Sequence, residues 1–332
     1  MANLLWLQSG GCGGCTMSLL NAESPDLVST LENAGINVLW HPSLSEQTGT
    51  EVKALLNQIL NDEIALDIFC IEGALLRGPH GTGRYHMLGG TGIAMIEWAE
   101  KLAAKAKYTL AIGTCAAFGG VSTAGDNITD ATGLQFEGEL RGGLLGSDYV
   151  SQEKLPVINV SGCPVHPGWV TETLLSLVID KPIKEDFDDF ARPRLYTDQL
   201  VHHGCTRNEY YEYKASAELP GEQGCMMEHM GCLGTQAHAD CNTRLWNGQG
   251  SCTRGGYACI NCTAPEFEEP RHSFTETPKI AGIPVGLPTD MPKAWFVALA
   301  SLSKAATPER LKHNARSEQL IYPPTLHKKN KS

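Results

Sequence analysis

The arrangement of the cysteines constrains this chain more than any other feature of its sequence. Twelve cysteines occur among 332 residues, and several stand in closely spaced groups that include two CxxC pairs. One pair is Cys12 and Cys15, near the start, and the other is Cys259 and Cys262. Thiols grouped in this way are typical of disulfide frameworks, metal sites or redox centres. The choice among these depends on the compartment in which the protein works.

Two features of the sequence indicate a cytoplasmic protein without a membrane anchor. A strand pattern at Leu4–Gln8 follows Met1 almost directly, without a basic leader or a twin-arginine pair. No stretch reaches the roughly 18 apolar residues that a membrane span needs, and Ala294–Ala305 reads as an ordinary helix. Because the cytosol keeps thiols reduced, we expect these cysteines to bind metal or to carry redox chemistry rather than form disulfides.

Composition excludes further classes of function. With 42% hydrophobic residues, the chain can build one large or two medium domains with buried cores. Its formal charge of −11 argues against general binding to nucleic acid, because phosphate binding needs a basic surface. The same charge gives no reason to expect anionic membranes as partners.

The N-terminal half alternates strand and helix patterns. The expected strands are Asn3–Gln8, Asn37–Trp40, Ile64–Ile71, Tyr108–Ile112 and Leu155–Val160. The expected helices are Met17–Ala34, Thr50–Leu60, Gly92–Ala106 and Thr171–Ile179. This alternation predicts an α/β fold with a doubly wound parallel sheet, similar to flavodoxin, in which functional loops gather at the carboxyl ends of the strands.

The second half has a different character. Beyond about Arg194 the strand patterns disappear, and glycine, cysteine, asparagine and proline become dense. Such a loop-rich, mostly helical segment needs metal or covalent links for stability. We therefore predict a flavodoxin-like domain at 1–186, a C-terminal domain at 187–306 that begins with a linker at Phe187–Arg194, and a solvated polar tail at 307–332.

The first group of thiols follows predicted strands. Cys12 and Cys15 stand in a glycine-rich turn after the first strand, Cys115 follows Tyr108–Ile112, and Cys163 follows Leu155–Val160. Glycines in such a turn let backbone N–H groups approach the sulfur atoms of a cluster. In a doubly wound sheet these loops meet at one edge. Four thiolates at one place suit a [4Fe–4S] cluster, and a zinc site is the alternative.

Two more sets of four occur in the second half. One combines His202 with Cys205, Cys225 and Cys232, and the other is Cys241, Cys252, Cys259 and Cys262. The spacing between His202 and Cys205 lets both reach one metal centre, whereas we expect the neighbouring His203 to serve as a hydrogen-bonding group. Zinc remains possible for either set alone. Three sets on one chain favour electron transfer, because zinc does not change its oxidation state.

The remaining cysteine, Cys70, has no place in these sets. It lies within the apolar strand pattern Leu66–Ile71. A buried free cysteine behaves there as a small hydrophobic residue. Eleven cysteines and one histidine thus complete three sets of four ligands, and no ligand is missing.

These residues together resemble the small subunits of nickel–iron hydrogenases. The resemblance rests on Trp6-Leu7-Gln8 before a CxxCT motif, on GTCA at Gly113–Ala116 and on GCP at Gly162–Pro164. It continues with HxxC at His202–Cys205 and with the closing CxxCT at Cys259–Thr263. The match runs from about residue 3 to residue 290.

The resemblance implies three clusters in series. A proximal [4Fe–4S] cluster near the active site would be held by Cys12, Cys15, Cys115 and Cys163. A distal cluster near the surface would be held by His202, Cys205, Cys225 and Cys232. A medial cluster between them would be held by Cys241, Cys259 and Cys262, with Cys252 as the fourth ligand.

Three positions depart from patterns found in other members of the family. Many members carry proline at the position of Cys252 and hold a three-iron medial cluster, so Cys252 predicts a four-iron cluster of lower potential. Oxygen-tolerant membrane-bound members carry two extra cysteines near the proximal cluster, at positions that correspond to Gly14 and Gly120. We therefore expect an ordinary four-cysteine proximal cluster.

The resemblance also implies a partner. Family members bind the nickel–iron centre in two CxxC motifs of a large subunit, and here only Cys70 is unassigned. This subunit would therefore conduct electrons within an obligate heterodimer, or a dimer of heterodimers, with Cys12–Cys15 facing the large subunit. Glu72, at the end of its strand, could line that interface.

Three functions stay open at this point. The run Leu7–Ser18 most resembles hydrogen-sensing regulatory hydrogenases of the cytoplasmic branch, which would signal to a histidine kinase, here through the tail after Thr307. The second possibility is a cytoplasmic uptake hydrogenase that feeds a quinone or another carrier. The third is a stand-alone ferredoxin-like carrier, against which the long flavodoxin-like domain argues.

Overall fold

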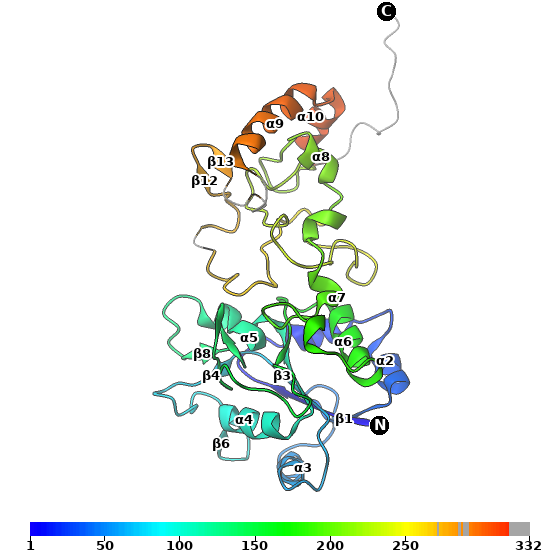
Figure 1. Ribbon diagram of the computed structural model, residues 1–332, viewed down its shortest axis with the longest axis vertical. Coiled ribbons are helices and arrows are strands. Elements are labelled where there is room, and N and C mark those ends of the chain that lie inside the picture. The colour runs from blue at the N-terminus through cyan, green and yellow to red at the C-terminus, as the bar shows by residue number, and fades with distance from the viewer. Residues whose placement is uncertain (271, 285–286, 288–291, 319–332) are drawn as a thin grey trace, which may run out of the picture. The chain divides into compact units, whose positions relative to one another are not determined.

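The chain folds into two compact units. The computed structural model describes residues 1–270, 272–284, 287 and 292–318 (Figure 1). The N-terminal unit comprises Met1–Asp198 together with Cys262–Glu269, and the C-terminal unit comprises Gln199–Asn261 and the chain from Pro270 onward. The chain therefore returns briefly to the first unit after entering the second. The predicted boundaries at 186 and 306 stay a prediction.

A five-stranded parallel sheet forms the centre of the N-terminal unit. In spatial order its strands are β2 (Ile36–Trp40), β1 (Ala2–Gln8), β3 (Ile68–Glu72), β7 (Tyr108–Ile112) and β11 (Ile158–Val160). Every residue of β3, β7 and β11 is buried, as is usual for a parallel sheet covered on both faces. This strand order confirms the predicted flavodoxin-like, doubly wound fold.

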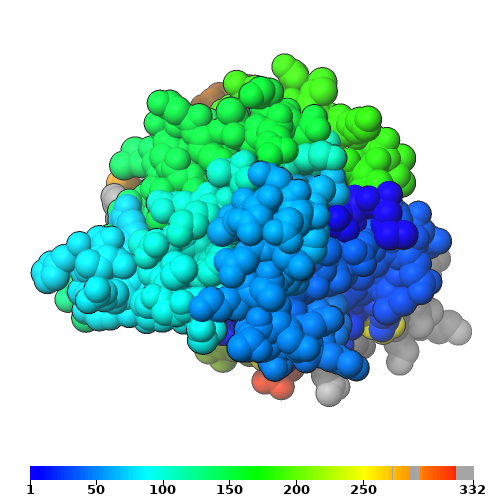
Figure 2. Space-filling model, turned by 90° about the horizontal axis from the view of Figure 1, so that it is seen from below, coloured from blue at the N-terminus to red at the C-terminus, as the bar shows by residue number. Residues whose placement is uncertain are grey.

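Helices cover both faces of this sheet (Figure 1). They are α1 (Gly14–Leu20), α2 (Leu27–Ala34), α3 (Thr50–Leu60), α4 (Met95–Lys105), α5 (Gly113–Phe118), α6 (Pro167–Ile179) and α7 (Arg194–Thr197). Helix α6 contacts α1 and α2, whereas α3 contacts α4. The surface seen in Figure 2 consists mainly of the blue and cyan segments of this unit, which include α3 and α4.

Short antiparallel pairs of strands occur in the connections between the elements of this unit. They are β4 (Leu75–Leu76) with β8 (Ala131–Thr132), β5 (Met87–Leu88) with β6 (Ile93–Ala94), and β9 (Phe136–Glu137) with β10 (Leu140–Arg141). One large core joins the sheet to α3 and α4, and it includes Leu5, Leu7, Phe69 and Ile71. The alternation of these side chains places Cys70 on the other face of β3, where it is fully buried.

Proline explains most differences from the predicted elements. The helix predicted at Met17–Ala34 is wrong: α1 ends at Leu20 and α2 begins at Leu27, because Pro25 and the residue before it disfavour helix. The last strand begins at Ile158, beyond Pro156, which cannot donate to the sheet. Conversely, Pro167 suits the first turn of α6, which begins earlier than predicted.

The segment predicted as a linker is an integral part of the N-terminal unit. Asn159 of β11 donates its backbone N–H to the Ala191 carbonyl oxygen at 2.9 Å. The buried Arg192 side chain lies 2.7 Å from the Asp188 carboxylate and donates to the Thr263 carbonyl oxygen at 3.0 Å. These contacts bind residues 187–193 to the sheet edge and to the returning segment Cys262–Glu269.

The C-terminal unit is rich in loops and helices, as predicted. Its regular elements are α8 (Asn208–Glu212), β12 (Lys279–Ile280), β13 (Ile283–Pro284), α9 (Lys293–Ala306) and α10 (Glu309–Ala315). Its described residues include small apolar clusters, among them one around Tyr210 and Leu311 and one around Tyr211 and Met227. None of the helices in the described part of the chain is long and apolar enough to cross a membrane.

The start of the predicted polar tail is an ordered helix rather than a solvated end. Helix α10 buries Leu311 and Ala315, and Arg310 forms an ion pair with Glu209 of α8. These two apolar side chains stand one helical turn apart. The polar composition of the tail hides this helical pattern in the sequence. Residues 319–332 lie outside the described part of the chain.

Candidate metal centres

The N-terminal unit brings the first four cysteines together at the carboxyl edge of its sheet. Cys12 follows β1, Cys15 lies in the first turn of α1, Cys115 lies in α5 after β7, and Cys163 follows β11. The thiols are close enough to influence each other electrostatically: Cys115 and Cys163 both raise the pKa of Cys15, and Cys12 raises the pKa of Cys163. Three segments far apart in sequence, after β1, β7 and β11, therefore converge, as parallel strands require.

Burial makes the ionised form of these thiols unfavourable unless a positively charged group lies beside them. For three of these thiols burial is the largest effect on the pKa: it raises the pKa of Cys15, and it raises the pKa values of Cys115 and Cys163 to about 11. Thiolates, rather than thiols, are the ligands of iron and zinc. These clustered thiols resist ionisation by themselves, but they would ionise beside metal ions. Their chemistry therefore fits an iron–sulfur group.

A buried carboxylate orients the turn that carries Cys15. Glu72, at the end of β3, is only 2% exposed. Its Oε1 accepts hydrogen bonds from the backbone N–H groups of Cys15 and Thr16, both at 3.1 Å, and its Oε2 accepts one from the Thr16 hydroxyl. Glu72 therefore acts inside the fold, where it holds the turn of Cys15.

Glycines give the sulfur atoms their space. Gly113 has φ +83°, and a Cβ at this position would lie 2.4 Å from Cys15 Sγ. Gly120 has φ +56°, and its Cβ would lie 3.0 Å from Cys115 Sγ. A side chain is disfavoured at both positions by the backbone conformation as well as by contact. At Gly14 a Cβ would lie 3.1 Å from Cys12 Sγ, so these glycines allow close approach to the sulfurs.

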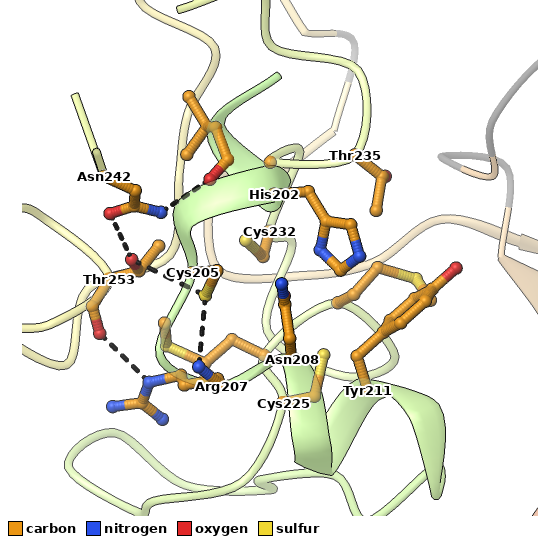
Figure 3. Close-up of a pocket in the computed structure, with 14 residues that line it drawn as sticks. His202, Cys205, Arg207, Asn208, Tyr211, Cys225, Cys232, Thr235, Asn242 and Thr253 are labelled. Atoms are coloured by element: carbon orange, nitrogen blue, oxygen red, sulfur yellow. Dashed lines mark hydrogen bonds between the residues drawn. The ribbon is translucent and has the colours of Figure 1, made fainter. Parts of the chain in front are cut away.

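The second set surrounds one cavity in the C-terminal unit (Figure 3). His202 comes from the turn Val201–Gly204, Cys205 follows it directly, and Cys225 and Cys232 come from a later loop. Burial raises the pKa of Cys225 to about 12 and raises that of Cys232. Burial lowers the pKa of His202, which favours the neutral imidazole that binds metals.

The two adjacent histidines have different surroundings. The His202 ring lines the cavity and lies edge-on to the Tyr211 ring, with 4.4 Å between the ring centroids. His203 Nδ1 instead accepts a hydrogen bond from the Leu200 backbone N–H at 3.3 Å. The structure therefore places His202, and not His203, among the three thiols of this cavity.

Polar groups of the cavity suit bound sulfur. The backbone N–H of Arg207 donates to Cys205 Sγ, and that of Cys259 donates to Cys232 Sγ, both at 3.4 Å. Such N–H···S bonds help to offset the negative charge of a cluster. Asn208 also lines the cavity, and its Oδ1 is buried without a hydrogen-bond partner in the described residues. This chemistry fits an iron–sulfur group held by one imidazole and three thiolates.

The third set divides between the two units. Cys241, Cys252 and Cys259 belong to the C-terminal unit, and Cys252 is exposed. Cys262 belongs to the N-terminal unit, where its carbonyl oxygen accepts a hydrogen bond from Thr114 Oγ1 at 2.6 Å. The assignment of these four cysteines to one cluster stays a prediction. In the described residues no three or more His, Cys, Asp or Glu side chains form a site for a single metal ion.

Comparison with known proteins decides the family. Residues 12–177 match the family described as NADH ubiquinone oxidoreductase, 20 Kd subunit, and residues 197–275 match the C-terminal family of NiFe/NiFeSe hydrogenase small subunits. The F420 non-reducing hydrogenase II small subunit of Methanosarcina mazei is 34% identical over 288 residues, which is 80% of this chain and 73% of that protein. The chain belongs to the hydrogenase small subunits.

Other members agree in sequence and in fold. The periplasmic [NiFeSe] hydrogenase small subunit of Desulfomicrobium baculatum is 31% identical over 82% of this hydrogenase small subunit and 86% of its own length. An actinobacterial-type NiFe-hydrogenase from Ralstonia eutropha H16 superposes with a TM-score of 0.76 and 27% identity, over 97% of this chain and 95% of that chain. This chain is thus one subunit of a hydrogenase, and its family works with a large subunit.

Two functional contacts were missed by sequence reasoning. Glu72 was expected to line the interface with the large subunit, not to bind the turn of Cys15, and Arg207 was not noted at all. The partners of Glu72 lie 56 and 57 residues away in sequence, and the Arg207 side chain binds backbone carbonyl groups. Sequence motifs reveal neither contact, because neither produces a recognisable spacing of residues.

Proposed function

We propose that this small subunit is the electron relay of a nickel–iron hydrogenase and holds three [4Fe–4S] clusters. The observation that carries the proposal is the convergence of four thiols in one unit and of one imidazole with three thiols in the other. A [4Fe–4S] cluster supplies one-electron transfer. The chain's part is to hold each cluster, to exclude water from its sulfurs and to direct N–H groups at them.

The three sets of ligands would act in series. The proximal set is Cys12, Cys15, Cys115 and Cys163, the medial set is Cys241, Cys252, Cys259 and Cys262, and the distal set is His202, Cys205, Cys225 and Cys232. Hydrogen would be activated on the large subunit, because Cys70, the only thiol left over, is fully buried in β3. The proximal set would face that partner.

The native complex offers the direct test of this relay. We expect the small subunit to co-purify with a nickel-containing large subunit, and hydrogen gas to reduce its clusters within the complex. Electron paramagnetic resonance before and after exposure to hydrogen is the measurement. A stable monomer that holds clusters, but has no nickel-containing partner, would instead indicate a ferredoxin-like carrier.

We further propose that the hydrogenase is a cytoplasmic hydrogen sensor. The support is the likeness of Leu7–Ser18 to the regulatory enzymes, and the proposed signalling partner is a histidine kinase. The alternative is a cytoplasmic uptake hydrogenase that feeds a quinone or another carrier. A heterodimer or a dimer of heterodimers is compatible with either role.

Truncation separates these two roles. A sensor should oxidise hydrogen slowly and bind a kinase through the tail after Thr307, so deletion of residues 319–332 should weaken kinase binding and leave hydrogen oxidation unchanged. The deletion must stop at 318, because removal of α10 would expose the buried Leu311 and Ala315. Co-precipitation with the kinase is the measurement. Unchanged binding after truncation, together with rapid turnover, would favour the uptake enzyme.

The medial cluster has its own test at Cys252. Substitution Cys252→Pro should remove one ligand and convert a four-iron cluster to a three-iron cluster. The oxidised variant should then show a strong three-iron signal in electron paramagnetic resonance, whereas the wild-type complex should show none. Cys252 is exposed, so its loss should have little effect on folding. A three-iron signal of full intensity in intact wild-type protein contradicts the assignment.

A further inference from the structure

The C-terminal unit buries an arginine whose side chain, within the described part of the chain, donates to backbone carbonyl oxygens. Arg207 is 7% exposed. Its Nε donates to the Thr253 carbonyl oxygen at 3.0 Å, and its Nη1 donates to the carbonyl oxygens of Glu222 at 2.6 Å and Gly224 at 2.7 Å. No carboxylate among the described residues forms an ion pair with it. Buried charges normally have an oppositely charged partner, so this one calls for an explanation.

Arg207 lies beside the candidate distal ligands. It lines the same cavity as His202 and the three thiols, as Figure 3 shows. Its backbone N–H donates to Cys205 Sγ. Its charge also acts on Cys232, where it opposes the rise in pKa that burial causes. The guanidinium is therefore near enough to interact with negative charge held by these ligands.

A second positive charge, that of Lys214, lies beside the Tyr211 ring, which lines the same cavity. The Lys214 ammonium lies 3.7 Å from the centroid of the Tyr211 ring and 5.1 Å from that of Phe296. The Tyr211 ring in turn contacts the His202 ring, and Lys214 also interacts electrostatically with Cys225. Lys214 forms no ion pair among the described residues, whereas the nearby Lys304 lies 2.9 Å from Glu228.

We propose that Arg207 and Lys214 are positioning residues that raise the reduction potential of the distal cluster. The inference rests on the proposed function, because it requires a cluster in this cavity. Reduction adds one electron, so the reduced cluster is more negative than the oxidised one. Two positive charges that form no ion pair with a carboxylate among the described residues stabilise the more negative form, and more strongly where burial weakens screening. Glu212 and Glu228 act on Lys214 electrostatically, but neither forms an ion pair with it in this part of the chain. The last site of the relay thereby becomes the electron sink of the chain.

Redox titration of the intact heterodimer, followed by electron paramagnetic resonance, tests the proposal. Arg207→Gln and Lys214→Met each remove one positive charge. At the wild-type midpoint potential, each should lower the ratio of reduced to oxidised distal cluster about tenfold, which is about 59 mV for one electron. Arg207→Lys keeps the positive charge, so its ratio of reduced to oxidised cluster should be close to that of the wild type. Lys312→Met, which removes an exposed, ion-paired charge outside the cavity, should leave the ratio unchanged.

A purely structural role predicts a different pattern. Arg207 also binds the Gly224 carbonyl oxygen, directly before Cys225, so Arg207→Gln could loosen the loop and lose the distal signal. Lys214 binds no backbone carbonyl oxygen of the residues that the structure describes, so Lys214→Met separates the two roles. An unchanged potential in Lys214→Met overturns the proposal, as does a loss of the distal signal in both Arg207 variants. If the wild-type complex lacks a distal four-iron signal altogether, the proposed function itself fails.

Discussion

Replacement of Cys115 by serine is expected to reduce hydrogen-dependent dye reduction by more than about 100-fold, beyond the 10–100-fold cost typical of changes around a metal site. Cys115 follows β7 and shares its surroundings with Cys12 and Cys163. Its loss leaves the proximal cluster with three thiolates and breaks the relay at its first step. Activity of the purified heterodimer and its iron content are the measurements.

Cys70 provides the matched control. It is a buried thiol in β3 of the same unit, and burial raises its pKa as it does for the candidate ligands. Cys70→Ala should keep full iron content and activity, at a cost of about 1 kcal/mol in the free energy of unfolding. The assignment would fail if Cys115→Ser stayed active, or if Cys70→Ala lost iron.

Substitution His202→Ala is expected to remove the distal cluster and to slow electron transfer to a protein acceptor by at least about tenfold. Among the described residues that line the cavity, His202 supplies the one imidazole beside the three thiols. The imidazole ring cannot be replaced by a methyl group without opening the site to water. The distal signal in electron paramagnetic resonance and the rate of acceptor reduction are the measurements.

The neighbouring residue again supplies the control. His203 accepts a hydrogen bond from the Leu200 backbone and does not line the cavity. His203→Ala should cost about 1 kcal/mol in stability and should keep the distal cluster. The reverse pattern, in which His203→Ala loses the cluster and His202→Ala keeps it, would show that the wrong histidine was assigned.

Local patterns predicted most of the sheet, because each buried strand carries its own signal. Tyr108–Ile112 and Thr50–Leu60 occur with the predicted limits. The run Ile64–Ile71 was apolar enough to suggest a longer strand, but β3 begins at Ile68, and Asp67 before it accepts the Asn3 N–H at 2.8 Å. Single prolines account for the divided helix and the shortened last strand.

The contacts that complete the candidate sites join residues distant in sequence. Glu72 reaches the turn of Cys15, and Arg207 reaches three carbonyl groups of other loops. The cysteines were recognisable because thiols are rare and their spacing is distinctive. Carboxylates and guanidinium groups are common, so their role depends on the fold that brings them to the sulfur atoms. Helix α10 was missed because its two buried apolar residues stand in a polar segment.

Mössbauer spectroscopy of the iron-57-enriched heterodimer, combined with metal analysis, tests the central claim most directly. A relay of three four-iron clusters predicts about twelve iron atoms in the small subunit, all in [4Fe–4S] environments, and no zinc. Hydrogen should then reduce these clusters in the same sample. Zinc bound at any of the three sets, or about eight iron atoms in place of about twelve, would contradict a relay built from three four-iron clusters.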